Sequence, residues 1–257
     1  MTVLLRGCDS AYAPDAAQIE AAKNQDVTWW GGYIGGADVL HEWSAQDFAT
    51  VGDAGFKILP IWVPVQFTAS FKPDEVVAGC LARCTQLGIP KGSAVAIDLE
   101  TALSDALNSS PSTLDTLVKG ITDGGYEPVI YGGGNLRAPQ WKADWYGTSW
   151  PVTLPPGSAY AVGWQWSSGS ASVLVPGVDL DVITQQVADK MWDGKSDKAV
   201  TAPVAVTPVD PTQVTTTVQT PATPVTTASP AFAAQLVKDA LASLTEALDT
   251  IYKLPQS

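Results

Sequence analysis

The hydrophobic positions of roughly the first 190 residues form short apolar runs that alternate with longer amphipathic segments. Short runs bounded by Gly, Pro and polar residues are typical of strands, and apolar residues three and four positions apart are typical of helices. The pattern predicts strands over residues 3–9, 28–34, 56–65, 93–100 and 127–131, and helices over 14–24, 44–54, 73–87 and 112–124. This repeated strand–helix order predicts a parallel sheet covered by helices.

The pattern changes after residue 131. Residues 143–150, 160–166 and 178–183 also have the composition of strands, but the gaps between them are rich in Pro, Gly and Ser and fit no helix. Eight strands with helices only after the early ones predict an α/β fold, a TIM-like barrel whose last third has lost its helices. In such barrels, functional residues lie at the carboxyl ends of the strands.

Residues 93–100 carry the clearest chemical signal. Small and branched apolar residues are followed there by Asp98 and Glu100, and alternate residues of a strand share one face. Two acids at the end of a buried strand are costly unless they have a function, and paired carboxylates are the groups that hydrolyse glycosidic bonds. A strand end with two solvated acids is the alternative. Asp9 and Asp179 also fall near predicted strand ends, which favours an acidic active site.

Composition narrows the choice of partner and cofactor. The formal net charge of -12 argues against nucleic acid and against an anionic membrane surface. The single histidine, His41, leaves no His-rich metal site and no His-based triad, so we expect no metal and no cofactor. The three cysteines are not a disulfide framework, and we expect Cys8 to pack in the core.

Aromatic and amide side chains near the predicted strands are candidates for sugar contacts. The chain has ten tryptophans, and flat rings also pack against sugar faces. The candidate substrate-binding residues are Tyr33, Tyr131, Trp164, Gln165 and Trp166. Core packing is the alternative for each ring. Gln165 lies within an apolar strand, so we expect it to have a buried hydrogen-bonding partner.

The N-terminus lacks a basic region followed by a long apolar core, so we expect no signal peptide. No run of about 18 apolar residues is present, and we expect no membrane span. The sequence therefore predicts a protein that is made in the cytoplasm and that, if it acts outside a cell, is carried there by a non-classical route.

The chain after residue 198 differs in composition from the barrel, which we assign to residues 1–198. Residues 199–229 are rich in Pro, Thr and Val, and we expect an extended linker. Residues 230–257 predict an amphipathic helix with the heptad seam Ala234, Val237, Leu241, Leu244, Leu248 and Ile251. This seam favours a homo-oligomer, and it favours a trimer over a dimer. The alternatives are docking on the barrel or on a virion protein.

Five short motifs resemble those of family 25 glycoside hydrolases, the muramidase lysozymes of bacteria and phages. The closer likeness is to the glycoside-hydrolase-like domain of unknown function found in actinobacterial envelope proteins and in phages. The motifs occupy residues 7–9, 96–100, 129–132, 163–167 and 178–181. The resemblance covers roughly residues 3–190 and implies a (β/α)5(β)3 barrel that cleaves the glycan of peptidoglycan.

The resemblance also implies residue roles. Glu100 is the general acid, Asp98 holds the substrate's acetamido group or stabilises the oxocarbenium-like centre, and Asp9 and Asp179 complete an acidic ring. Residues 58–64 depart from the muramidase aromatic pattern and are nearer the glycoside-hydrolase-like branch. The alternative function is therefore a catalytically weak or inactive carbohydrate-binding or structural module of a phage tail or an envelope assembly, tethered by its C-terminal helix.

Overall fold

The structure is a computed structural model of the whole chain. It describes residues 2–36, 41–64, 71–99, 111–132, 137–143, 150–154, 159–167, 172 and 174–195. All of these residues belong to one compact unit, Met1–Pro203. Glu100, the predicted linker 199–229 and the predicted helix 230–257 lie outside the described residues.

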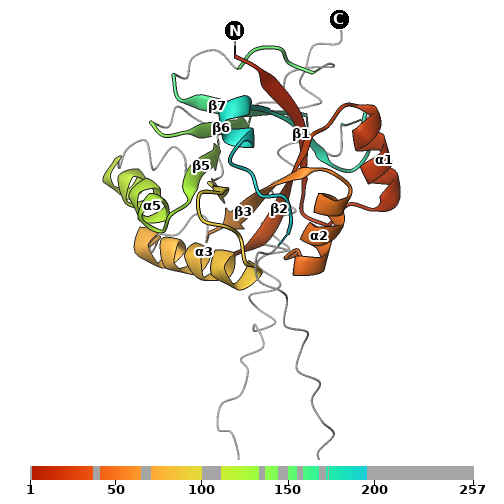
Figure 1. Cartoon of the computed structure of the whole chain (residues 1–257). Coiled ribbons are helices and arrows are strands. Elements are labelled where there is room, and N and C mark those ends of the chain that lie inside the picture. Colours follow the sequence, from red (N-terminus) through yellow and green to blue (C-terminus); the bar gives the residue numbers. More distant parts are fainter. Residues whose placement is uncertain are drawn as a thin grey trace, which may run out of the picture. The chain divides into compact units, whose positions relative to one another are not determined.

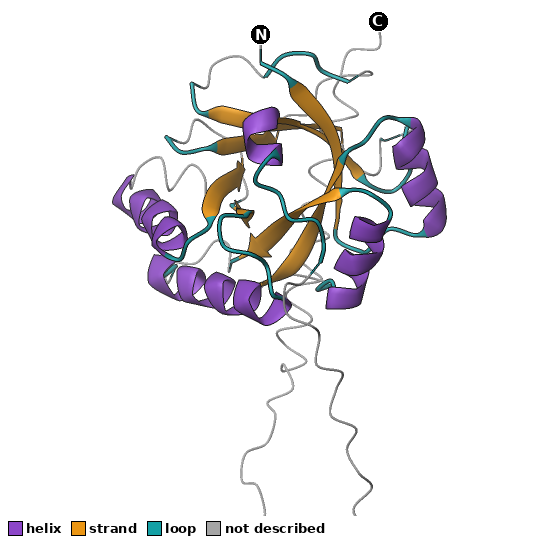
Figure 2. Ribbon diagram, in the orientation of Figure 1, coloured by secondary structure: helices purple, strands orange, loops and turns teal. Residues whose placement is uncertain are grey.

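Eight strands form a closed barrel in sequence order (Figures 1 and 2). They are β1 Leu4–Ser10, β2 Trp29–Gly36, β3 Lys57–Val63, β4 Ala94–Asp98, β5 Glu127–Gly132, β6 Gln140–Ala143, β7 Ala161–Ser167 and β8 Asp179–Thr184. Neighbours from β1 to β7 are parallel, whereas β8 is antiparallel to both β7 and β1. The start of β8 therefore lies beside the carboxyl end of β1.

Helices cover the outside of the early strands. They are α1 Ala16–Asn24, α2 Ala45–Asp53, α3 Pro73–Leu87 and α5 Pro111–Asp123. The short α6 Gln185–Ala188 follows β8, and its Val187 and Ala188 belong to the same buried group as Trp29. In Figure 1, α3 and α5 lie side by side on one side of the barrel, and α1 and α2 lie on the other. The predicted α/β barrel is confirmed. The finer (β/α)5(β)3 pattern implied by the resemblance stays a prediction, because residues 133–136, between β5 and β6, are outside the described part. None of the described helices is long and apolar enough to cross a membrane.

Two helices begin at reciprocal capping boxes. Asp15 accepts a bond from the backbone N–H of Gln18, and the Gln18 side chain accepts one from the backbone of Asp15. Ser44 and Asp47 repeat this arrangement at α2. Each box satisfies two N–H groups that a helix start otherwise leaves unpaired. Local sequence therefore sets where both helices begin.

The sixth strand differs from its prediction. The structure places β6 at Gln140–Ala143, so the strand begins before the predicted range 143–150, of which residues 144–149 lie outside the described residues. The strand has only four residues and begins with a buried glutamine, so it shows no apolar alternation in the sequence. The aromatic residues that follow it have the composition of a strand, so the sixth strand was predicted too late in the chain.

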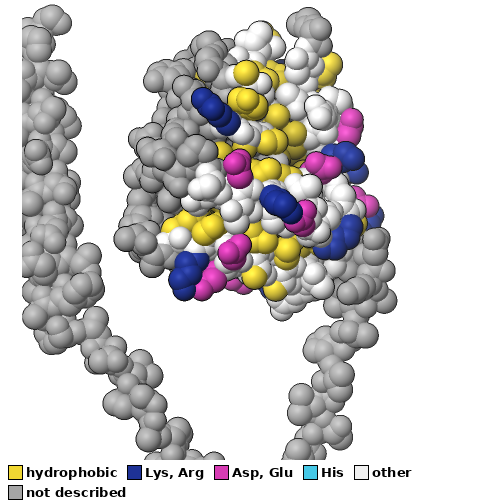
Figure 3. All heavy atoms as spheres, turned by 90° about the vertical axis from the view of Figure 1, so that its left-hand side faces the viewer, with side chains coloured by type: hydrophobic (Ala, Val, Ile, Leu, Met, Phe, Trp, Pro, Cys, Tyr) yellow, Lys and Arg dark blue, Asp and Glu magenta, His cyan; other side chains and the backbone are white. Residues whose placement is uncertain are grey.

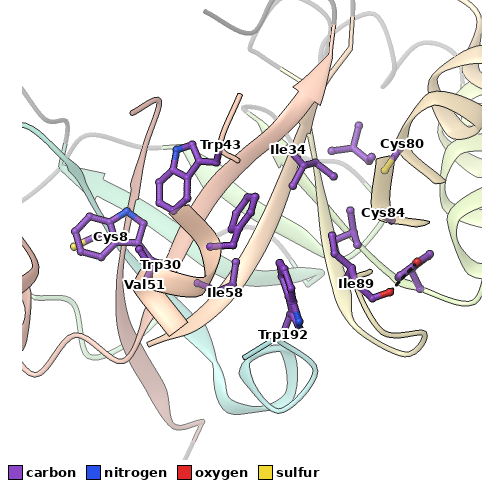
Figure 4. Packing of buried hydrophobic residues seen from close by; sticks show 14 of the residues in the cluster. Cys8, Trp30, Ile34, Trp43, Val51, Ile58, Cys80, Cys84, Ile89 and Trp192 are labelled. Atoms are coloured by element: carbon purple, nitrogen blue, oxygen red, sulfur yellow. Dashed lines mark hydrogen bonds between the residues drawn. The ribbon is translucent and has the colours of Figure 1, made fainter. Parts of the chain in front are cut away.

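Buried apolar residues form two groups, one inside the barrel and one between the barrel and its helices. The inner group includes Trp29, Ile61 and Trp141. The outer group includes Trp30, Trp43 and Trp192 together with the cysteines of α3 (Figure 4). Alternate residues of each strand supply the two groups. Cys8, Cys80 and Cys84 are buried free thiols, which confirms the core-packing prediction for Cys8.

Charged side chains of both signs are interspersed with apolar ones on the face shown in Figure 3. The described residues also form surface ion pairs, such as Lys72 with Glu75 at the start of α3 and Lys119 with Asp123 on α5. The acidic net charge of the sequence therefore does not form a single-sign patch on the described part of this face.

Candidate active site

Three of the four predicted acids lie together at the end of the barrel where β1 and β4 finish. Asp9 is near the end of β1, Asp98 is the last residue of β4, and Asp179 is the first residue of β8. Asp9 and Asp179 are direct partners in the β1–β8 register. Asp98 is close enough to Asp9 to raise its pKa. The fourth acid, Glu100, lies outside the described residues.

Asp181 joins this cluster from one layer deeper in the barrel. Its strand partners are Gly7 on β1 and Gln165 on β7, and its side chain is fully buried. The predicted site residue of this strand is Asp179, and Asp181 is not among the predicted acids. Residues 179 and 181 are two positions apart on one strand and therefore point to the same face, so the sequence indicates both acids equally.

Gln165 connects the acids. Its Nε2 donates to Asp9 Oδ2 at 3.0 Å and to Asp179 Oδ2 at 2.8 Å, while its Oε1 accepts a bond from the Tyr131 hydroxyl. The assigned amide orientation fits its partners, because the flipped amide would turn its carbonyl oxygen towards the acceptor oxygens of two carboxylates. The predicted buried partner of Gln165 is thus confirmed, and it is a pair of acids from two strands.

Burial and mutual repulsion set the charge states of this cluster. Burial raises the pKa of Asp9 well above its usual value, and the nearby carboxylate of Asp179 raises it further. Burial first, and then the charge of Asp9, also raise the pKa values of Tyr33 and Tyr131. Both tyrosines therefore remain neutral hydrogen-bonding groups near neutral pH. A set of carboxyl groups in different protonation states can both donate and accept protons.

Two tryptophans fill the barrel beneath the acids. Trp141 Nε1 donates to Asp181 Oδ1 at 3.1 Å, and the Trp141 ring packs edge-on against Trp29 and Tyr131, with centroids 5.8 and 4.7 Å apart. Gly7 provides the space for Trp29, because a Cβ at residue 7 would lie 1.9 Å from Cε2 of that ring. The barrel interior is therefore a packed floor, and the polar groups lie above it.

Gly31 provides the corresponding space beside the acids. It is the β2 partner of Asp9, and a Cβ at residue 31 would lie 2.8 Å from Asp9 Cβ and 2.9 Å from Ile61 Cδ1. Real Cβ atoms essentially never approach other atoms so closely. The side chain of Asp9 therefore depends on a glycine on the next strand.

The structure does not bring Trp164 and Trp166 to this cluster. Trp166 lies in the outer hydrophobic group, with its ring centroid 5.3 Å from that of Trp150, and Trp164 packs against the same group. They flank Gln165, which points inward, so strand alternation directs both rings outward. A role of Trp164 and Trp166 as sugar contacts stays a prediction, but it is separate from the acid cluster, whereas Tyr33 and Tyr131 do interact with the acids.

The described residues contain no group of three or more His, Cys, Asp or Glu side chains that could hold a metal ion. The groups available for chemistry at this end of the barrel are carboxyls, two tyrosine hydroxyls and the amide of Gln165.

No family model matches the chain, and no curated protein matches it. Solved structures share its fold. An uncharacterized B. stearothermophilus protein superposes with a TM-score of 0.56 at 16% identity, covering 73% of this chain and 100% of that one. A family GH25 lysozyme from Aspergillus fumigatus superposes with a TM-score of 0.51 at 14% identity, covering 74% of this chain and 99% of that one. The catalytic domain of endolysin ply40 from bacteriophage P40 of Listeria monocytogenes superposes with a TM-score of 0.50 at 15% identity, covering 76% of this chain and 98% of that one. The predicted likeness to family 25 is confirmed for the fold.

Proposed function

We propose that the chain is a muramidase-like glycoside hydrolase that acts on peptidoglycan or a related cell-wall glycan. The observation that carries this proposal is the cluster of Asp9, Asp98 and Asp179 at the carboxyl end of the early barrel strands. The shared fold supports the proposal, because it is also the fold of a GH25 lysozyme and of an endolysin catalytic domain.

The proposed chemistry uses Asp98 and Glu100. Glu100, two residues after Asp98, protonates the glycosidic oxygen as the C–O bond breaks, and water completes the hydrolysis. Asp98 binds the acetamido group or stabilises the positive charge that develops on the sugar. Asp9 and Asp179 raise the pKa of nearby carboxyls and so favour the protonated form that a general acid needs at neutral pH.

Tyr33 and Tyr131 are the proposed sugar contacts among the described aromatic residues. Both have raised pKa values, first through burial and then through the neighbouring acids, so they present neutral hydroxyl groups and ring faces. The Tyr131 hydroxyl donates to Gln165, which leaves its oxygen lone pair for a substrate hydroxyl.

The test is the release of reducing ends from purified cell walls by wild type and by Glu100→Gln. Loss of a general acid typically lowers the rate by about 10²–10⁴-fold. Glu127→Gln is the matched control, because Glu127 is exposed at the amino end of β5, away from the acid cluster. We expect that variant to cleave like wild type.

Equal cleavage by wild type and Glu100→Gln would remove Glu100 from the mechanism. Sedimentation of the protein with cell walls, without release of reducing ends by wild type, would favour the alternative binding or structural module. The same samples therefore separate an enzyme from a binding protein.

We further propose that residues 230–257 attach the barrel to a virion, either by self-association or by docking to a virion protein. The heptad seam of this segment and the Pro/Thr-rich linker before it support the proposal. Mass spectrometry of purified phage particles that carry the gene tests it. Absence of the chain from such particles would contradict a virion role.

A further inference from the structure

Asp181 occupies a position that is unusual for an ionised side chain. It is 0% exposed, and it lies on β8 between Gly7 of β1 and Gln165 of β7. The residues beneath it are aromatic, with Trp141 in direct contact. An isolated carboxylate in such surroundings is strongly destabilising, because it has lost its water and gained no opposite charge.

The two oxygens of Asp181 have different partners. Oδ1 accepts a hydrogen bond from Trp141 Nε1 at 3.1 Å. Oδ2 is fully buried, and no donor among the described residues reaches it. Asp9 is the diagonal neighbour of Asp181 in the β1–β8 register, and its charge raises the pKa of Asp181. Two carboxylates have only acceptors, so a hydrogen bond between this pair requires a proton on one of them.

The other contacts decide which acid carries the proton. Asp9 Oδ2 accepts a bond from Gln165 Nε2 at 3.0 Å, which favours the ionised form of Asp9. A proton on Asp181 Oδ2 turns the atom without a donor into a donor. We propose that Asp181 is a neutral carboxylic acid whose Oδ2–H donates to the carboxylate of Asp9, and that it positions Asp9 within the candidate active site.

The electrostatic surroundings agree with this assignment. The ionisable side chains that interact with Asp181 in the described part are Asp9 and Cys8 on β1, Tyr131 on β5 and Asp179 on its own strand. None of them supplies positive charge. Burial is the main cause that raises the pKa of Asp181, followed by the charges of Asp9 and Asp179. The pKa of Asp9 is also raised, by burial and then by Asp179, and its interaction with Asp181 offsets part of that rise.

The protonation state of Asp181 is independent of catalysis, but its positioning role rests on the proposed glycosidase function. A neutral Asp181 holds Asp9 by one strong hydrogen bond and adds no further negative charge to the cluster. The proton on Asp181 is therefore detected by spectroscopy, and the cleavage of cell walls is measured separately.

The test combines infrared spectroscopy with unfolding of the full chain. The spectra are recorded in a Glu100→Gln background, which removes the band of the proposed general acid. At neutral pH, we expect this protein to show the C=O stretching band of a protonated carboxylic acid, and the added Asp181→Asn to abolish it. Asp9→Asn should keep the band, because an amide oxygen at residue 9 still accepts the proton of Asp181. Asp189→Asn, at an exposed position after α6, is the matched control and should also keep it.

Unfolding gives a second readout. A neutral Asp181 releases its proton on unfolding, so each pH unit between about 5 and 7 should raise the unfolding equilibrium constant of wild type about tenfold relative to Asp181→Asn. Asp181→Ala, which cannot bond to Asp9 or Trp141, should be less stable than Asp181→Asn throughout.

Absence of the band from the Glu100→Gln protein would overturn the proposal even if a variant fails to fold. Loss of the band in Asp9→Asn but not in Asp181→Asn would place the proton on Asp9 and also overturn it. If the band and the pH dependence behave as expected while wild type releases no reducing ends, the proton assignment stands and the glycosidase function fails.

Discussion

Asp9 on β1 and Asp179 on β8 face each other directly across an antiparallel strand pair, and the amide of Gln165 donates to both. Like charges opposite each other destabilise a sheet. The two N–H groups of one amide offset that repulsion without adding charge, and they fix the relative positions of both acids. Gln165 is thus the neutral link on which the geometry of the acid cluster depends.

Replacing this link with an acid should destabilise the protein in a pH-dependent way. In Gln165→Glu, the new side chain loses both donors and adds negative charge between Asp9 and Asp179. We expect a loss of about 2–4 kcal/mol at neutral pH, and a smaller loss at pH 5, where the new carboxyl is protonated more easily. Urea unfolding at both pH values measures this difference.

Gln185→Glu is the matched control for Gln165→Glu. Gln185 also donates an amide hydrogen to an acid, Asp189, at 2.7 Å, but both residues are exposed on the surface. The same substitution there should change stability by no more than about 0.5 kcal/mol. Equal effects at the two positions would show that burial and the two-acid contact of Gln165 do not matter.

The same substitution, Trp to Phe, can be made at Trp141 inside the barrel and at Trp166 on its outer face, and the two variants can be compared. Trp141→Phe removes the N–H that Asp181 Oδ1 accepts, and leaving a buried acceptor without its donor costs about 1–3 kcal/mol. No described group accepts a bond from Trp166 Nε1, so Trp166→Phe loses only packing. We expect Trp141→Phe to be the less stable variant by thermal unfolding, and the one with altered cell-wall cleavage.

Much of the fold could be predicted from the sequence alone. Strand–helix alternation, caps and apolar runs predicted most elements, because each is a local signal. The position of Asp9 and Asp98 at one rim followed from a general rule of barrels, that the carboxyl ends of strands gather at one end.

The inward or outward direction of a ring required the register between strands. Trp164 and Trp166 flank Gln165 in a run where every residue suits a strand, and only pairing with β8 shows that residue 165 points inward. The role of Asp181 depends in the same way on its pairing with Gly7 and Gln165. Contacts between residues so distant in the chain have no local signal in one sequence.

Gly31 should tolerate no side chain. In Gly31→Ala, the new Cβ meets Asp9 Cβ and Ile61 Cδ1, and overpacking of this kind costs about 1–3 kcal/mol. The displacement of Asp9 should also lower cell-wall cleavage. Adding Ile61→Val removes one of the two obstructing atoms, so the double variant should regain stability but not activity. Additive losses in the double variant would contradict this explanation.

Tyr131 should make the protein less stable at alkaline pH. Burial raises its pKa above the ordinary value, so the native state keeps the phenolic proton that the unfolded chain releases. Stability from this group is complete below about pH 10 and falls above it. Tyr131→Phe should show a shallower loss between pH 9 and 11 in denaturant titrations. Tyr160→Phe, at an exposed position, is the control and should keep the slope of wild type.

The last prediction concerns the segment after the barrel. Leu241 and Leu244 belong to the predicted heptad seam of residues 230–257, and burying a charge between helices at such a seam is strongly unfavourable. We expect the full chain to sediment as an oligomer, with a trimer favoured, and Leu244→Asp to sediment as a monomer. Ser243→Asp adds the same charge one residue away, off the seam, and should leave the oligomer intact. A monomeric wild type would instead favour docking to a partner, and dissociation by Ser243→Asp as well as Leu244→Asp would show that charge, rather than the seam, controls assembly.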